Sequence, residues 1–328
     1  MIVAYLKSGP MKAVAALSLG LALPCAPASA ESILFVGNSF TYGEPAGGPP
    51  VVQNYRPNTV TDLVGTGIGG VPALFKAFTL QAGLNYNVSL ETQGGTGVDY
   101  HYNNRLGLIN QPWDNVVLQS YSTLDANRPG NPATLIQYSA LLANAFTAQN
   151  PNVNILLDAT WSRADQTYLP SGAWYGQDIS AMQRDVEAGY RAADANSPLI
   201  DGVIPVGAAW DRAIRTGFAD PNPYDGIMNG LVNLWAPDNY HASPYGYYLE
   251  ALMFFGSITG LDPLSLGGGE YVARDLGFTM GQALSLQNIA HDQLAVAVPE
   301  PTSLALFGIG VLGMGLVRRR RMGAGLPA

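Results

Sequence analysis

Two short motifs that lie far apart in the chain contain the residue types of a serine nucleophile and its base. Ser39 follows a glycine and an asparagine directly after the apolar run at residues 33–36. Asp238 stands three residues before His241, so its carboxylate can hold one imidazole nitrogen while the other nitrogen deprotonates a serine. These three side chains predict an acyl-transfer site, provided that the fold brings them together.

Each motif also has a purely structural interpretation. A glycine and a serine after a strand are typical of a plain turn or a helix cap. Asp238 and His241 also fit a loop that caps the helix expected after Ser243 and Pro244. The first motif is not the G-x-S-x-G elbow of α/β-hydrolases, because Thr41 occupies the position of the second glycine. The chemistry therefore depends on the elements that position the two motifs.

Apolar runs and amphipathic segments alternate along the chain between the two motifs. Short runs rich in β-branched residues, bounded by Gly, Asn, Asp or Pro, predict strands at residues 33–36, 86–90, 116–118, 153–157 and 203–206. Helices are predicted at residues 72–82, 133–149, 179–196, 208–215 and 245–258. This alternation predicts a doubly wound α/β domain with a parallel sheet of about five strands, whose functional residues lie at the carboxyl ends of the strands.

In this order and spacing, the Gly-Asn-Ser39 and Asp238-x-x-His241 motifs resemble the SGNH (GDSL-like) hydrolase family. The resemblance covers most of residues 33–258. It implies a flavodoxin-like three-layer α/β/α sandwich and the hydrolysis of esters. It also implies that Ser39 is the nucleophile, His241 the base and Asp238 the residue that orients the imidazole. Asn38 departs from the aspartate usual in the first block of the family, a change found in many relatives.

The same resemblance implies three hydrogen-bond donors for an oxyanion. The first is the amide of Ser39, and the second is a glycine amide after the second strand, which we assign to Gly95 with Gly94 as the alternative; both glycines could instead only relieve a crowded turn. The third donor in the family is an asparagine side chain after the third strand; this chain has no G-x-N-D motif there, and Gln119 takes that place, as in a related bacterial branch. One such donor lowers a barrier by about 3 to 4 kcal/mol. Ser120 departs from the glutamate that commonly follows in the related bacterial branch.

Both ends of the chain have the features of targeting segments. Residues 11–30 combine a basic start, a short apolar run and small residues, which predicts a secretory signal peptide. Near the other end, a Pro-Glu-Pro sequence at residues 299–301, the apolar residues 303–317 and four arginines resemble the PEP-CTERM sorting signal of Gram-negative bacteria. An ordinary tail anchor is the alternative, and the arginines stay on the cytoplasmic side in either case.

These segments define the expected organisation: a signal peptide at 1–30, an SGNH-like domain at 31–290, a linker at 291–302 and a sorting signal with a membrane segment at 303–328. The PEP-CTERM resemblance implies an exosortase-type processing enzyme as a partner, transient contact of the tail with the inner membrane, and an organism that makes exopolysaccharide. The domain is then expected in the periplasm, on the cell surface or outside the cell.

A glycine-rich segment at residues 65–70 also fits the G-x-G-x-x-G pattern of dinucleotide-binding loops, and Glu91 ends the next strand. Three points disfavour that interpretation: residues 59–64 make a poor buried strand, Pro72 reduces the amide density at the helix start, and an exported protein rarely meets NAD. We therefore expect no cofactor, and the serine chemistry requires no metal.

The charge and cysteine content of the chain exclude several functional classes. With 16 basic and 24 acidic residues, the chain has a net charge of -8, so a general nucleic-acid binder is not expected. Removing Lys7, Lys12, Glu300 and the arginines at 318–321 leaves 10 basic and 23 acidic residues in the exported part, a net charge of -13. The only cysteine, Cys25, lies in the signal peptide, so the mature chain has no disulfide and no cysteine metal site.

The sequence thus predicts an exported serine esterase that hydrolyses carboxylic esters, with an O-acetylated polysaccharide as its expected substrate. A domain this acidic favours neutral or acetyl-masked glycans over highly charged ones. The alternative is a catalytically inactive protein that keeps the same fold to bind glycan in a matrix. His101 has two interpretations in either case: contact with a substrate, or a cap within its own loop.

Overall fold

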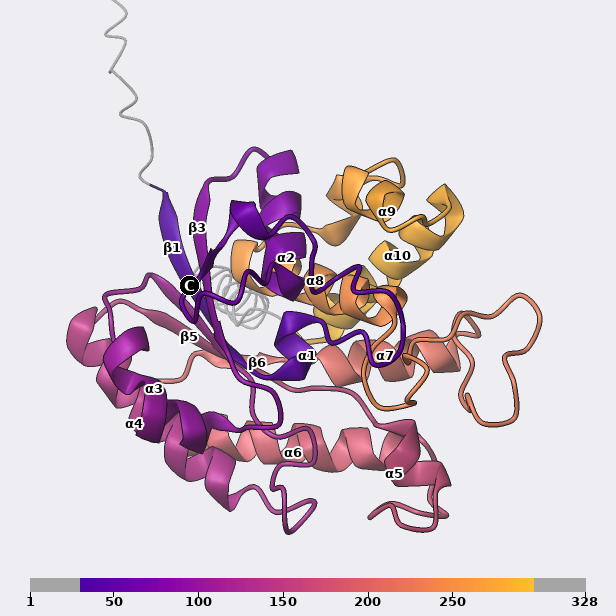
Figure 1. Ribbon diagram of the computed structural model, residues 1–328, viewed down its shortest axis with the longest axis horizontal. Helices are drawn as coiled ribbons and strands as arrows, with labels where there is room; N and C mark the ends of the chain where they lie inside the picture. Colours follow the sequence, from indigo (N-terminus) through magenta and orange to yellow (C-terminus); the bar gives the residue numbers. More distant parts are fainter. Residues whose placement is uncertain (1–29, 298–328) are drawn as a thin grey trace, which may run out of the picture.

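The computed structural model describes residues 30–297, and its framework is a parallel sheet in the order β2-β3-β1-β4-β5-β6 (Figure 1). The strands are β1 (Glu31–Gly37), β2 (Thr61–Asp62), β3 (Tyr86–Thr92), β4 (Asn115–Leu118), β5 (Asn154–Asp158) and β6 (Gly202–Ile204). The predicted doubly wound sheet is confirmed, with six strands instead of about five because the two-residue edge strand β2 pairs with β3.

The central strand β1 is apolar throughout its core because helices cover both faces of the sheet (Figure 1). Ile33 and Phe35 pack on one face, and Leu34 and Val36 pack on the other. The first face is covered by α2 (Gly70–Gln81), α7 (Val206–Arg215), α8 (Pro244–Thr259) and α10 (Met280–Ala297). The second face is covered by α3 (Val98–Ile109), α4 (Ala133–Gln149) and α6 (Ser180–Asn196). The result is the expected three-layer α/β/α sandwich.

Shorter elements complete the fold at the sheet edge and between the long helices. They are α1 (Ser39–Tyr42), η1 (Pro57–Thr59), α5 (Ala164–Tyr168), η2 (Pro263–Leu266) and α9 (Tyr271–Asp275). The five helices predicted from the sequence are all present, with ends shifted by up to two residues. Helix α3 was not predicted, because it buries few side chains and contains glycine and two asparagines.

Helix α10 corrects the predicted boundary between domain and linker. The helix continues to Ala297, so residues 291–297 extend a helix of the domain although the sequence assigned them to a linker. Leu286, Ile289 and Ala290 are buried against the sheet-covering helices, which anchors α10 on the domain. This hydrophobic packing stabilises the helix enough for it to continue through the polar segment around His291. The half-exposed His291 ring pairs with Asp262 at 3.0 Å.

The glycine-rich segment at residues 65–70 wraps around a side chain of its own chain. The Asp62 carboxylate accepts hydrogen bonds from the backbone N–H groups of Val64, Gly65, Thr66 and Ile68 at 2.8–3.3 Å. Burial raises the pKa of Asp62, but the hydrogen bond from the Thr66 hydroxyl at 2.7 Å, together with the backbone hydrogen bonds, outweighs burial and holds the pKa below its ordinary value. The amides that would bind a phosphate in a dinucleotide loop are thus already occupied by a carboxylate.

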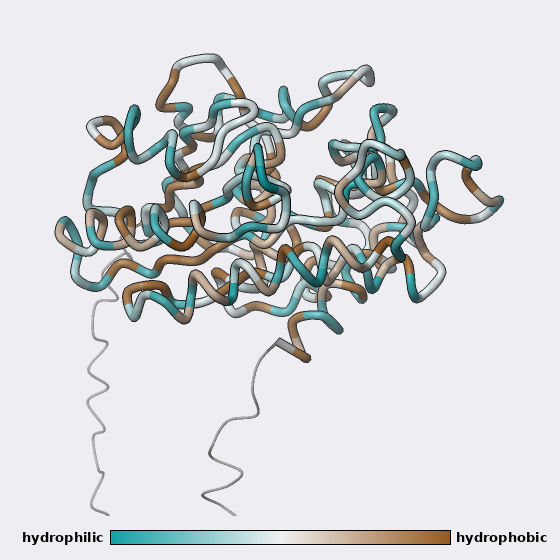
Figure 2. Tube along the Cα trace, turned by 90° about the horizontal axis from the view of Figure 1, so that it is seen from below, coloured by the Kyte–Doolittle hydropathy of each residue, from teal (hydrophilic) through white to brown (hydrophobic). Residues whose placement is uncertain are grey.

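Figure 2 shows hydrophobic residues through the interior of the domain, while its outer loops contain both hydrophilic and hydrophobic residues. Within residues 30–297, no helix is long and apolar enough to cross a membrane. The predicted signal peptide and the predicted membrane segment at 303–317 both fall outside the residues that the structure describes.

Candidate active site

Ser39 begins helix α1 at the carboxyl end of β1, one residue after a sharp turn. A Cβ on Gly37 would lie 2.1 Å from a neighbouring side-chain oxygen, so only glycine permits this turn. Asn38 caps α1 and donates hydrogen bonds from its amide nitrogen to the carbonyls of Thr96 (2.8 Å) and Ser120 (3.1 Å). The turn that presents Ser39 is therefore tied to the segments that follow β3 and β4.

Asp238 and His241 lie in the loop between α7 and α8 and form a close pair. The His241 Nδ1 lies 2.6 Å from Asp238 Oδ2, and the backbone N–H groups of Tyr240 and His241 donate to Asp238 Oδ1 at 3.1 and 3.0 Å. Burial works to raise the pKa of Asp238, but the hydrogen bonds from His241 and from both amides hold it below the ordinary value. The ionised carboxylate keeps the proton on Nδ1 and leaves Nε2 free to accept one.

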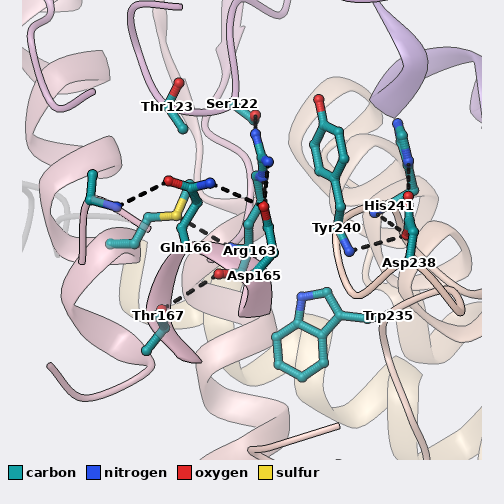
Figure 3. A network of polar contacts seen from close by, with 12 residues as sticks. Ser122, Thr123, Arg163, Asp165, Gln166, Thr167, Trp235, Asp238, Tyr240 and His241 are labelled. Carbon is teal, nitrogen blue, oxygen red and sulfur yellow. Dashed lines mark hydrogen bonds and ion pairs between the residues drawn. The ribbon is translucent and has the colours of Figure 1, made fainter. Parts of the chain in front are cut away.

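The ring of Tyr240, a residue of this loop, packs against the side chains of His241 and Arg163 (Figure 3). It lies 4.1 Å from the His241 ring between centroids, and the Arg163 guanidinium lies 3.5 Å from its centroid on another side. Arg163 is itself fixed by two hydrogen bonds to Asp165, at 2.9 and 2.6 Å, and the backbone N–H of Asp165 donates to the carbonyl of Asn239 at 3.2 Å. Residues after β5 thus clamp the Asp238–His241 loop.

The structure brings Ser39, Asp238, His241 and Gly95 together around one open pocket of about 420 Å³. The remaining lining residues are Tyr42, Glu44, Ala46, Gly94 and Tyr240. Sequence reasoning did not place Tyr42 or Glu44 in the site. Their proximity to Ser39 in the sequence was the available signal, but it is a weak one, because Phe40 and Thr41 are closer still and are buried away from the pocket.

Backbone N–H groups in the pocket wall are available to a bound oxygen. Within the described part of the chain, the amides of Ser39, Gly94 and Gly95 have no hydrogen-bond acceptor. Gly95 has a φ of 71°, a left-handed conformation that glycine adopts without strain, and it is exposed at the pocket wall. This geometry supports Ser39 and Gly95 as oxyanion donors, and Gly94, in the same wall, stays the alternative for the second.

Gln119 does not point into the pocket in this structure. It is 1% exposed and is not among the residues that line the pocket. Its Oε1 accepts hydrogen bonds from the Asn38 N–H at 2.8 Å and from the Thr41 hydroxyl at 3.3 Å, and its Nε2 donates to the Ser120 carbonyl. Gln119 therefore holds the turn that carries Ser39, and because it is buried outside the pocket, donation to an oxyanion would require its side chain to move.

The contacts of His101 favour a structural role within its own loop over contact with a substrate. Its ring is fully buried, with Nδ1 at 2.5 Å from the Glu91 carboxylate at the end of β3 and Nε2 at 3.3 Å from the Thr96 hydroxyl. Glu91, which the dinucleotide pattern would assign to a ribose, is likewise fully buried and occupied by His101. The pair therefore supports the loop that carries Gly94 and Gly95 from beneath.

Residues 297–321 match the protein family described as "PEP-CTERM protein-sorting motif". The chain carries a PEP-CTERM sorting motif. The motif indicates an exported protein and implies recognition by an exosortase-type processing enzyme. The motif begins at Ala297, the last residue of α10, so it follows the folded domain directly. No curated protein matches the sequence.

A solved structure shares the fold of this PEP-CTERM protein at low sequence identity. A DUF4886 family protein from Bacteroides uniformis superposes with a TM-score of 0.52 and 17% identity, covering 84% of this chain and 99% of that protein. A family 3 carbohydrate esterase from Clostridium thermocellum gives a TM-score of 0.44 and 16% identity, covering 69% of this chain and 94% of that protein. The first likeness shows that the fold of the domain has a precedent along nearly its whole length.

Proposed function

We propose that this protein is an exported serine esterase of the SGNH type. The observation that carries the proposal is the pocket in which Ser39, the Asp238–His241 pair and the free amides of Ser39 and Gly95 meet. A nucleophile, a base with its orienting carboxylate, and two donors for an oxyanion are the parts that acyl transfer requires. The PEP-CTERM motif supports action outside the inner membrane.

The proposed reaction proceeds through an acyl-enzyme. Ser39 Oγ attacks the ester carbonyl while His241 Nε2 takes its proton, and the amides of Ser39 and Gly95 stabilise the oxyanion. When the carbon–oxygen bond to the alcohol breaks, His241 returns the proton to the leaving oxygen. Water then attacks the acyl-Ser39 ester with His241 again as base, which releases the carboxylic acid and regenerates the serine. Asp238 stays ionised and stabilises the imidazolium in both halves.

An O-acetylated polysaccharide is the proposed substrate. The pocket is open, so it can admit an acetyl ester on a long chain, and acetyl needs no large acyl cavity. The net charge of -13 over residues 31–297 favours a neutral polymer over a polyanion. The PEP-CTERM motif is expected in organisms that make exopolysaccharide, which would place such a polymer beside the protein.

A fluorophosphonate probe tests the proposal directly. Ser39 is expected to react covalently, because only a serine activated by a neighbouring base attacks phosphorus at a useful rate. Mass spectrometry of the digested protein should find the adduct on the peptide that contains Ser39 and no adduct in the Ser39→Ala variant. A folded protein that takes up no probe while binding glycan would instead support the inactive matrix protein.

His101→Gln is expected to lower kcat for p-nitrophenyl acetate by about 10- to 100-fold, because a small displacement of the Gly95 amide weakens transition-state binding. Since His101 is fully buried beneath the loop, it acts as a positioning residue and KM should change much less than kcat. Steady-state kinetics measure both constants. His291→Gln, which alters a half-exposed histidine paired with Asp262, is the matched control, and an unchanged kcat in His101→Gln would contradict the supporting role.

A further inference from the structure

Glu44 occupies a fixed position in the wall of the candidate active site. Its backbone N–H donates to the Ser39 carbonyl at 3.0 Å, and its own carbonyl accepts a hydrogen bond from the Tyr247 hydroxyl at 3.1 Å. Tyr247 is buried in α8 and also donates to the Ser39 carbonyl at 3.3 Å. The position of Glu44 relative to the nucleophile is therefore set by the framework of the domain, although the residue lies in a loop.

The side chain of Glu44 is also held in one orientation. The Tyr42 hydroxyl donates to Glu44 Oε2 at 2.9 Å, and the Ala46 N–H lies 3.4 Å from Oε1. Burial, followed by the contact with Glu44, raises the pKa of Tyr42 well above its ordinary value, so the phenol stays a neutral donor. Tyr42 in turn borders Gly94, where an added Cβ would lie 3.0 Å from its hydroxyl. A preorganised carboxylate thus sits next to the loop of the second oxyanion donor.

The charge of Glu44 is not compensated within the pocket. The lining contains two acidic residues, Glu44 and Asp238, and no lysine or arginine. Asp238 is paired with His241, whereas Glu44 forms no ion pair within residues 30–297. Each carboxylate oxygen can accept more than one hydrogen bond, so Glu44 retains acceptor capacity after its contacts with Tyr42 and Ala46.

We propose that Glu44, oriented by Tyr42, determines the specificity of the site by accepting hydrogen bonds from hydroxyl groups of a neutral sugar alcohol and by repelling esters that carry a carboxylate. The inference rests on the proposed esterase function and adds that the protein recognises the alcohol part of the ester. An acetyl group has no hydrogen-bond donor, so a hydroxyl that contacts Glu44 belongs to the alcohol part of the ester. Glu44 is itself partly buried, so water screens its charge less than that of a fully exposed carboxylate.

A matched pair of substrates tests this proposal: an acetylated methyl glucoside, and the corresponding methyl glucuronoside with a carboxylate in place of the hydroxymethyl group. The protein is expected to hydrolyse the neutral ester with a kcat/KM at least about tenfold higher, and this ratio should decrease as salt is added. Glu44→Gln is expected to reduce the ratio to within about threefold of unity, since it removes the charge but keeps the shape. Glu187→Gln, which changes the net charge equally at a distant salt bridge with Arg191, should keep the ratio of the unmodified protein.

Several results would overturn the inference while the esterase function stands. These are equal kcat/KM values for the two sugar esters, an undiminished ratio in Glu44→Gln, and hydrolysis of p-nitrophenyl acetate without any hydrolysis of the neutral sugar ester. A ratio that falls equally in Glu187→Gln would assign the discrimination to net charge and would also overturn it. Failure of the esterase function itself is distinguishable, because the fluorophosphonate probe would then leave Ser39 unlabelled.

Discussion

Replacing Ser39 by alanine is expected to lower kcat for p-nitrophenyl acetate by about 10⁴-fold or more, and His241→Ala by a similar factor. The double variant should be no slower than either single variant, because the serine and its base act as one unit and the loss of either removes the same step. The residual rate should stay above that of the uncatalysed reaction, since the Gly95 amide can still stabilise an oxyanion formed by attacking water.

Steady-state and single-turnover kinetics on the three variants measure these factors. His291→Ala is the matched control for His241→Ala, because it removes a histidine of a second His–Asp pair that lies outside the pocket. Losses that multiplied in the double variant would contradict a shared mechanism. A folded Ser39→Ala variant with unchanged kcat would mean that another group of the protein attacks the ester.

The local features of the catalytic motifs could be predicted from the sequence because they depend on short stretches of chain. Gly37 is required by the turn it makes, and the three-residue spacing of Asp238 and His241 is enough for their hydrogen bond. The apolar run of β1 likewise reveals a strand that is covered on both faces. That Ser39 and the loop of Gly94 and Gly95 lie close together follows from the parallel sheet, because β1 and β3 are neighbours that end at the same edge. The position of the Asp238–His241 loop, between α7 and α8, does not follow from the strands.

Contacts between distant segments could not be predicted in the same way. Gln119 has the right residue type at the right strand end, but its orientation depends on the Asn38 N–H, which lies 81 residues away in sequence. The amides of the glycine-rich loop fit a phosphate by pattern, and only the fold shows that the Asp62 carboxylate occupies them. A sequence motif gives the donors and acceptors of a site, whereas tertiary contacts decide which of them remain free.

Two buried carboxyl groups, which no sequence pattern indicates, are expected to make the stability of the domain depend on pH. Asp158 ends β5 and Glu250 lies within α8, and both are completely buried. Within the described residues, no other polar group donates a hydrogen bond to their four oxygens, and each carboxyl affects the pKa of the other. Burial raises the pKa of Asp158 to about 8 despite the opposing hydrogen bond with Glu250. Burial, followed by the charge of Asp158, raises the pKa of Glu250 well above its ordinary value.

These shifts determine the sign of the pH dependence. A carboxyl whose pKa is raised on folding binds more protons in the folded state than in the unfolded state between the two pKa values. For Asp158 this window runs from pH 3.8 to about 8. Burial of Asp158 therefore destabilises the folded state least below pH 3.8 and destabilises it more as the pH rises through the window. The free energy of unfolding is therefore expected to fall by a few kcal/mol, on the order of 3, between pH 5 and pH 9.

The double variant Asp158→Asn/Glu250→Gln replaces the two acids by amides of nearly the same shape, which can hydrogen-bond to each other without a charge. It is expected to remove most of the decline and to be more stable than the unmodified protein at pH 9 by on the order of 3 kcal/mol, as measured by urea unfolding at several pH values. Glu187→Gln is the control for the loss of an exposed carboxylate and should leave the decline in place. If the double variant lost stability with rising pH as steeply as the unmodified protein, the shared burial of Asp158 and Glu250 would not be the cause.

Because α8 contains both Glu250 and Tyr247, which binds the Ser39 carbonyl, ionisation of the pair should also loosen the nucleophile turn at alkaline pH.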